Sequence, residues 1–522
     1  MEQKNKKKIS TQTIIKLLLA VVLLGLSAFL LKGDVWTFWT WWLLAGVMGF
    51  AAMPVTGRLF WRFEDKGWIF SKVLAIAATG FLTWFLTAIR LIPFNALTCA
   101  AVTILCAVIC FFLLRKESKE KTECFPVDRI SLIYWEELLF FLAFLMWTYL
   151  AGFRPAAYGT EKFMDYGFME AMMRSTTLPA RDLWYSEGHI NYYYGGQYFA
   201  VFLTKLSHTK VELTYNLMRT FVAGLAFAMP FSLVYQMMSD RMKGQQKSEK
   251  VIKGLPFAAG FTAGTAVSIA GNMHYVIYAQ IIPLIEKLTG KEVSSYWFPD
   301  ATRYIGYNPY REEDRTIHEF PCYSFVLGDL HAHVVNIMFV LLVIALLYVW
   351  LRGVRKKTVP VEASMKDGKF WKEQLLMPHL LVISALLGMF QWTNFWDFVI
   401  YYVVTLGTVL FANIIRFQGK IKKIMVVTFA QMAEIYLLAY LVILPFTLQF
   451  DTMVDGIGIA KYHSYFYQLL VLWGLPAVLT ITFVISMLWE KLRGMEHKSL
   501  YRLIKAIRTA DLFAIIMGLC AI

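Results

Sequence analysis

Two polar segments of an otherwise apolar sequence carry the residue types best suited to chemistry. The second of them, residues 318–333, reads H-E-F-P-C-Y-S-F-V-L-G-D-L-H-A-H and places Asp329, His331 and His333 at alternate positions. Alternate side chains of an extended chain project to one side, so this carboxylate and the two imidazoles are suited to bind a divalent metal ion. In the alternative, Asp329 caps a helix and the histidines lie at a wet interface. The spacing alone leaves both interpretations open.

The first polar segment contains a cluster of aromatic residues. Residues 183–198 read L-W-Y-S-E-G-H-I-N-Y-Y-Y-G-G-Q-Y. Aromatic side chains at a bilayer surface commonly form an interfacial belt. The functional interpretation is a platform for a sugar or a lipid phosphate, because tyrosine rings stack on sugar faces and nearby hydroxyl and amide groups form hydrogen bonds. The residues of this platform are Asn191, Tyr192, Tyr193, Tyr194 and Gln197.

An acidic residue precedes the aromatic cluster. Asp165 lies in the first turn of a predicted helix that also contains Arg174 and that Pro179 should end. One face of this helix is apolar, which is typical of a helix that lies on a membrane. Asp165 is therefore either an acidic residue favoured by the helix dipole or a carboxylate with a chemical role.

Further polar residues fall inside predicted membrane spans. Residues 391–397 read Q-W-T-N-F-W-D and place Asn394 and Asp397 at the outer end of one span, while Glu434 lies in the middle of another. Ionisable groups inside a membrane are candidates for function. We expect Asn394 and Asp397 to line a cavity shared with the external segments, and Glu434 to pair with a neighbouring helix.

The elements that position these residues are membrane-spanning helices. Of the 522 residues, 58% are hydrophobic and only 17% are charged, and the mean hydropathy is +0.53. The sequence therefore predicts an all-α transmembrane bundle of 12 or 13 spans. A thirteenth span would begin at Asp511, too close to Ile522 to cross, so we expect the complete protein to continue. The other expected spans are residues 13–31, 36–53, 68–89, 92–114, 132–152, 217–238, 254–275, 333–351, 376–391, 395–415, 424–447 and 466–489.

Basic residues predict the orientation of the bundle. The lysines within residues 4–8 place the N-terminus in the cytoplasm, and later basic clusters then also fall in cytoplasmic segments. The formal charge of +15 is explained by this bias and by anionic lipids, without nucleic acid. For consistency, residues 192–206 must form a helix in the outer interface. The basic clusters are residues 115–121, 241–250, 352–357, 416–423 and 491–498.

This count predicts where the polar segments lie and how the chain is organised. Residues 153–216, 276–332 and 448–465 are expected outside the plasma membrane. The expected parts of the chain are an N-terminal four-span accessory region (residues 1–130), a transmembrane core (131–490) and a cytoplasmic basic segment leading to the thirteenth span (491–522).

Three motifs together resemble a known family. N-Y-Y-Y-G-G-Q at residues 191–197, the run at residues 318–333 and T-N-F-W-D at residues 393–397 are similar to motifs of the YYY family of bacterial and archaeal membrane proteins. The resemblance covers about residues 130–415. That family in turn resembles the C-type glycosyltransferase superfamily, which uses polyprenyl-phosphate-linked sugars.

The superfamily resemblance implies a catalytic carboxylate in the first large external loop of the core, and Asp165 matches that position. It also implies a lipid-linked sugar donor and an external acceptor. The usual adjacent pair of acidic residues is absent here, because Lys162 and Met164 occupy the neighbourhood. A metal held through that loop is therefore not implied, which leaves the divalent ion of the Asp329 run as a separate hypothesis.

The predicted activity is thus inverting transfer of a sugar from a polyprenyl phosphate to an extracytoplasmic acceptor, with Asp165 as the general base. Arg174, Arg303 or the histidines would stabilise the leaving phosphate. Glu319, Asn394 and Asp397 are further expected substrate contacts. The alternatives are a transporter, which should place its site near the midplane between inverted repeats, and a non-catalytic membrane scaffold.

Overall fold

The computed structural model describes residues 11–120, 124–159, 161–243, 249–355, 365–418, 420–452 and 461–493. Throughout these ranges the secondary structure is helical, with two isolated bridges and no strand, as the sequence predicts. The chain forms two compact units, namely Met1–Ala270 with Ser324–Val454 (unit 1) and Gly271–Tyr323 with Asp455–Ile522 (unit 2). The expected thirteenth span lies outside the described residues.

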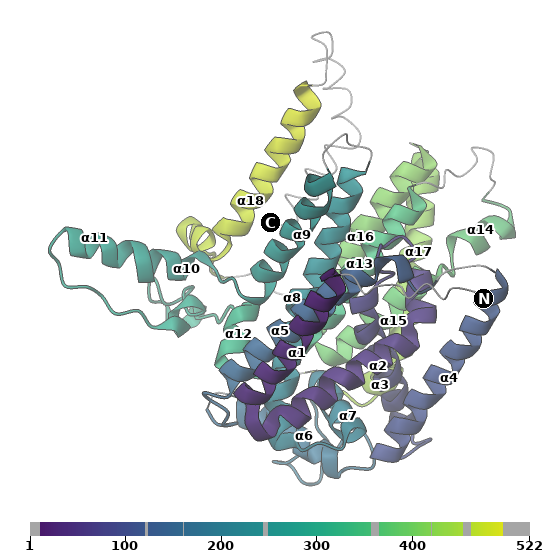
Figure 1. Ribbon diagram of the computed structural model, residues 1–522, viewed down its shortest axis with the longest axis horizontal. Coiled ribbons are helices and arrows are strands. Elements are labelled where there is room, and N and C mark those ends of the chain that lie inside the picture. Colours follow the sequence, from purple (N-terminus) through teal and green to yellow (C-terminus); the bar gives the residue numbers. More distant parts are fainter. Residues whose placement is uncertain are drawn as a thin grey trace, which may run out of the picture. The chain divides into compact units, whose positions relative to one another are not determined.

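Unit 1 is a bundle that contains most of the helices (Figure 1). The four N-terminal helices belong to it and do not form a unit of their own. Its helices are α1 (Thr11–Leu31), α2 (Val35–Leu59), α3 (Trp68–Ala88), α4 (Ala96–Glu120), α5 (Ile130–Ala151), α6 (Lys162–Arg174), α7 (Gly195–Ser207), α8 (Val211–Met242), α9 (Glu249–Ser268), α13 (Ala332–Val354), α14 (Gly368–Gln374), α15 (Pro378–Thr393), α16 (Phe395–Phe417) and α17 (Ile421–Thr447), with the 3-10 turns η1 (Lys32–Asp34) and η2 (Val127–Arg129).

Unit 2 combines an irregular segment with one long helix. The short helix α12 (Pro321–Leu327) contains the point at which the chain passes from unit 2 to unit 1. The elements of unit 2 are α10 (Met273–Tyr275), the π-helix η3 (Val276–Ile281), α11 (Ile282–Leu288), the 3-10 turns η4 (Phe298–Ala301) and η5 (Glu312–Asp314), and α18 (Phe466–Arg493).

Nine helices within the described ranges are long and apolar enough to cross a membrane, or up to eleven if two bent helix pairs each count as one span. The twelve predicted spans all fall largely on helices. Eleven spans differ from the twelve predicted because Thr11–Leu59 counts as one helix of 49 residues, although η1 interrupts it. At about 1.5 Å per residue, this stretch is long enough to cross about 30 Å of hydrocarbon twice.

The core of unit 1 is built around α8, which is buried over most of its length. A helix that is apolar on all sides can be covered by lipid or by other helices, and here α5, α9 and α13 pack on it. The approach of α9 is close because Gly260 and Gly264 face α8. A Cβ at either glycine would lie 2.6 Å from a backbone oxygen, that of Phe231 or Phe227. This is the small-residue packing common between membrane helices.

The helix expected in the outer interface lies inside unit 1 instead. The described helix is α7, and its residues from Gly195 to Lys205 are all buried. It packs against α3, α4, α8, α13 and α15. Its 13 residues extend only about 20 Å, so it is too short to span a membrane. Figure 1 shows α6 and α7 together at one end of the bundle.

The orientation of the bundle is a testable prediction. Ser186 and Glu313 are both exposed and fall in segments that the basic residues predict to be external. A single cysteine at either position, in a background without the native cysteines, should react with a membrane-impermeant thiol reagent in intact cells. If both cysteines react only after permeabilisation, the orientation is inverted and a site at α6 and α7 would face the cytoplasm.

Candidate functional site

The centre of the site is the carboxylate of Asp165 in the first turn of α6. This residue is only 1% exposed. Nε2 of Gln197, on α7, donates to its Oδ1 at 2.7 Å and also donates to the carbonyl oxygen of Leu330 at 3.1 Å. A single amide therefore ties α6 to the segment that precedes α13.

The second partner of Asp165 is His331, the N-cap residue of α13. Its Nδ1 lies 3.4 Å from Oδ2 of Asp165 and 3.8 Å from Oε2 of Glu161, while its Nε2 lies 3.7 Å from Oδ2 of Asp329. The imidazole of His331 therefore lies among three carboxylates.

The pKa of Asp165 is raised above its ordinary value. Burial is the main cause, because it disfavours the charged carboxylate, and the negative charge of Asp329 adds to the effect. The contacts with His331 and Gln197 stabilise the carboxylate and offset part of this rise. A carboxylate with a raised pKa is a stronger base than an exposed aspartate, which suits it to accept a proton.

Two cations converge beside these acids. Arg219, on α8, is 2% exposed, and Lys162, at the start of α6, is half-buried. A Cβ on Gly328 would lie 2.6 Å from Nη1 of Arg219 and 3.2 Å from Nζ of Lys162. Both cations interact with the charge of Asp329. Within the described residues, no hydrogen bond or ion pair holds the Lys162 ammonium, whose pKa is lowered mainly by burial.

Three side chains from two helices hold the backbone before α13 in place. Arg219 donates to the carbonyl oxygen of Phe325 at 2.7 Å, and the Leu330 N–H donates to the Tyr215 hydroxyl at 3.3 Å. Gln197 binds the Leu330 carbonyl from α7. Between these contacts Gly328 has φ +96°, a conformation that glycine adopts without strain. The segment that carries Asp329 and His331 is therefore fixed by α7 and α8.

The structure divides the tyrosine triplet between two environments. The rings of Tyr192 and Tyr193 lie 4.2 Å apart. The pKa of Tyr192 is raised mainly by burial, then by Tyr193, and to a smaller extent by the charge of Asp165. Tyr194 instead points into unit 1, where its hydroxyl accepts a hydrogen bond from Nε1 of Trp84 at 3.0 Å. The first two tyrosines therefore accompany the Asp165 site, and the third has a packing role.

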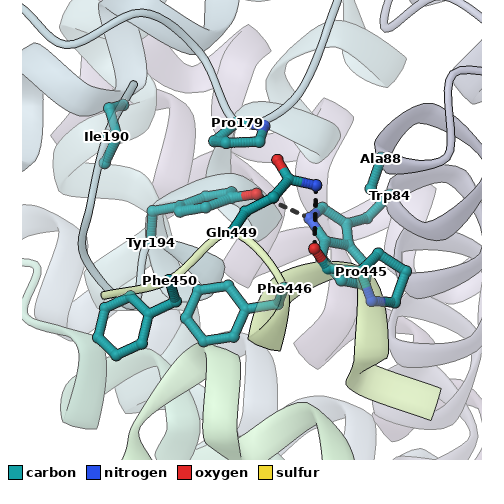
Figure 2. Close-up of a pocket in the computed structure, with 9 residues that line it drawn as sticks. All are labelled: Trp84, Ala88, Pro179, Ile190, Tyr194, Pro445, Phe446, Gln449 and Phe450. Carbon is teal, nitrogen blue, oxygen red and sulfur yellow. Dashed lines mark hydrogen bonds between the residues drawn. The ribbon is translucent and has the colours of Figure 1, made fainter. Parts of the chain in front are cut away.

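Tyr194 also lines a small pocket (Figure 2). Its walls are apolar and aromatic, and the one amide among them, Gln449, donates to the carbonyl oxygen of Pro445 at 3.0 Å. Asn191 is not one of the lining residues, and its side chain exchanges two hydrogen bonds with the Asp451 backbone. The pocket is lined by Trp84, Ala88, Pro179, Ile190, Tyr194, Pro445, Phe446, Gln449 and Phe450.

Asn394 and Asp397 form a second polar cluster. Oδ2 of Asp397 accepts hydrogen bonds from Asn394 at 2.8 Å and from Asn336, on α13, at 2.7 Å. Asn336 lies one turn after His333, so α13 connects the two clusters. Glu434 joins neither of them. Its Oε1 accepts from the Leu376 N–H at 2.8 Å, between α14 and α15, so it stabilises a connection between helices.

Three further residues were predicted to contact the substrate. Arg174 is exposed at the end of α6 and lies 3.9 Å from Glu170. Arg303 and Glu319 belong to unit 2, where the guanidinium of Arg303 stacks over Trp297. The cations that do approach the site, Lys162 and Arg219, were not predicted as site residues. A charged residue inside an apolar span was the available signal for Arg219.

The metal hypothesis gains no support from the arrangement of donors. In the part of the chain that the structure describes, no group of three or more His, Cys, Asp or Glu side chains is placed to hold a metal ion. Both ring nitrogens of His331 face carboxylates, and its ring centroid lies 5.6 Å from that of His333. Lys162 and Arg219 supply positive charge at the same acids. We therefore derive no step through a metal.

Comparison with known proteins identifies a family. A family model with the description "uncharacterized membrane protein (DUF2298)" matches residues 78–522, a range that includes both polar clusters. No curated protein and no solved structure matches the chain.

Proposed function

The chain belongs to this family of uncharacterized membrane proteins, DUF2298, and we propose that it is a glycosyltransferase that moves a sugar from a polyprenyl phosphate to an extracytoplasmic acceptor. The observation that carries the proposal is the buried carboxylate of Asp165, which is oriented by Gln197 and His331 beside two cations. The resemblance to the C-type glycosyltransferases, in which this position is acidic, supports it.

Asp165 acts as the general base in this proposal. The acceptor hydroxyl oxygen attacks the anomeric carbon of the sugar, and its proton passes to the Asp165 carboxylate. The bond between the anomeric carbon and the phosphate oxygen breaks, so the products are a glycoside of inverted configuration and a polyprenyl phosphate. Gln197 fixes the direction of the carboxylate, which matters because a base has to lie within hydrogen-bond reach of the proton it accepts.

Lys162 and Arg219 stabilise the charge that develops on the leaving phosphate. Arg219 is held by hydrogen bonds to Phe325 and Asn216, so its guanidinium is preorganised. The Lys162 ammonium has no such partner in the described chain and is available to a ligand. Preorganised positive groups in a site shielded from water are commonly the largest contribution to catalysis. In this proposal Lys162 and Arg219 stabilise the leaving phosphate, a role that the sequence analysis assigned to Arg174, Arg303 or the histidines.

The activity can be tested with membranes that contain the complete protein and a set of labelled polyprenyl-phosphate sugars. We expect protein-dependent transfer of label to an acceptor together with release of polyprenyl phosphate. Transfer should persist after treatment with a chelator, because Lys162 and Arg219 carry the positive charge. Loss of transfer on chelation would instead favour the metal hypothesis for Asp329, His331 and His333. Failure of the folded protein to use any donor of the set would contradict the proposal.

A further inference from the structure

Unit 1 contains a buried arginine that does not contribute to the Asp165 site. Arg416, in the last turn of α16, is 5% exposed. Its Nη2 donates to Oε1 of Gln374, on α14, at 2.5 Å, and its Nη1 donates to Oδ1 of Asn413 at 3.2 Å. Its Nε is buried without a hydrogen-bond partner. Neutral amides therefore hold this guanidinium, and within the described residues no carboxylate pairs with it.

The amides that hold Arg416 are themselves fixed by hydrogen bonds. Asn413 donates to Thr428 at 3.0 Å and to Gln431 at 2.9 Å, both on α17, and Gln431 donates to the Gln374 carbonyl at 2.8 Å. These bonds turn two amide oxygens toward the arginine and connect α14, α16 and α17. The network orients the guanidinium but supplies no negative charge.

A second arginine of unit 1, Arg352, differs from Arg416 in having a carboxylate partner. Arg352, near the end of α13, has its guanidinium 2.6 Å from Oδ1 of Asp240. Burial of a cation is costly unless an opposite charge compensates for it. Arg416 is more buried than Arg352 and has only dipoles around it, so its environment favours binding of an anion.

The surroundings of Arg416 indicate where such an anion comes from. Lys420 and Lys422 are exposed just beyond α16, and the ammonium of Lys423 lies 6.0 Å from the Phe370 ring centroid. The adjoining face of α17 is apolar and exposed in steps of four residues, which is the face that a membrane helix turns to lipid. Its residues are Ile421, Met425 and Phe429.

We propose that Arg416 and the lysines at 420–423 bind the phosphate group of an anionic phospholipid. The last turn of a transmembrane helix lies at the level of the lipid headgroups. Lysines that follow such a helix attract anionic lipids, while the exposed stripe of α17 accommodates the acyl chains. The leaflet is the one that the basic residues predict to be cytoplasmic, so this site is separate from the Asp165 site and independent of the proposed transferase activity.

The proposal can be tested by the affinity of the purified full-length protein in detergent for phosphatidylglycerol and phosphatidylcholine. Binding is read from the concentration-dependent rise in melting temperature, because a ligand of the native state stabilises it. We expect phosphatidylglycerol to bind and phosphatidylcholine to have little effect. Arg416→Met should weaken phosphatidylglycerol binding by about tenfold or more, and Arg416→Lys should retain part of it.

Two further variants keep the test decisive if Arg416→Met fails to fold. The first is the double variant Lys420→Gln and Lys422→Gln, whose two positions are not part of the amide network. It should weaken phosphatidylglycerol binding several-fold without a change in the melting temperature of the lipid-free protein. Arg58→Met is the matched control. Arg58 lies in the last turn of α2 and donates to the Leu113 carbonyl of α4, so its replacement should leave lipid binding unchanged. Wild-type affinity in a folded Arg416→Met or in the lysine variant would overturn the proposal. An equal effect of phosphatidylcholine or of inorganic phosphate would overturn it as well.

Discussion

Replacement of Asp165 by asparagine is expected to lower the rate of glycosyl transfer by about a hundredfold to ten-thousandfold, the usual contribution of a general base. The asparagine oxygen can still accept the hydrogen bond from Gln197, so α6 and α7 should remain in contact and donor binding should persist. The measurement is transfer from a polyprenyl-phosphate sugar, with the melting temperature as a check on folding.

The pH dependence of the wild-type rate is a second readout of the same base. A base acts in its deprotonated form, and the pKa of Asp165 is raised by burial. The rate should therefore increase with pH through this raised pKa, and activity should be lost at pH values where an exposed aspartate, with a pKa of about 4, would still be ionised. The residual rate of the Asp165→Asn variant should not show this increase with pH.

Two acidic residues of the segment between α5 and α8 serve as controls for Asp165. Asp182 accepts hydrogen bonds from the backbone N–H groups of Trp184 and Tyr185, which an asparagine can also do, and Glu187 is exposed. Asp182→Asn and Glu187→Gln should therefore transfer sugar at close to the wild-type rate. If Asp165→Asn also does so while Asp329→Asn abolishes transfer, then the catalytic carboxylate is Asp329 and our assignment is wrong.

The helices of unit 1 were predictable because each membrane span is encoded by a local run of apolar residues. A run of apolar residues long enough to cross the hydrocarbon is a signal that depends on no distant contact. The segment that became α7 shows where this signal ends. Its apolar residues were interpreted as an interfacial helix, yet Gly195 packs against Trp392 and Gly196 against Val335. Burial by other helices and burial by lipid require the same residue types, so composition cannot separate them.

The members of the site differ in how far the sequence could predict them. Asp165, Gln197, Asp329 and His331 were all singled out, because acidic, amide and imidazole groups are conspicuous in apolar surroundings. Gln197 bonds both Asp165, more than 30 residues away, and Leu330, more than 130 residues away. The sequence has no local signal for contacts between such distant segments.

The cations beside Asp165 show the same limit. Arg174 and Arg303 were chosen because they lie in segments that were predicted to be external, and the structure places one at an exposed helix end and the other in unit 2. Lys162 was noted only as a departure from the acidic pattern of the superfamily. Its position near Gly328 depends on the way in which α6 meets the segment before α13.

Replacement of Lys162 by methionine is the prediction that separates the structural assignment from the sequence-based one. Methionine keeps the length and apolar stem of lysine but removes its charge. Loss of one preorganised positive group in a site of this kind lowers a rate by about a hundredfold to a thousandfold. Because no hydrogen bond or ion pair holds the ammonium within the described structure, the melting temperature should stay close to that of the wild type while transfer decreases.

Arg174→Met is the matched control, because Arg174 lies on the same helix as Lys162, is exposed and has only a distant contact with Glu170. Its transfer rate should remain within about twofold of the wild type, as for most exposed ion pairs, which contribute little. Single-turnover rates at saturating donor measure the chemical step and distinguish it from donor binding. If Arg174→Met lowers transfer and Lys162→Met does not, then the leaving phosphate is stabilised at the exposed end of α6, and the cation site beside Gly328 has no part in the reaction.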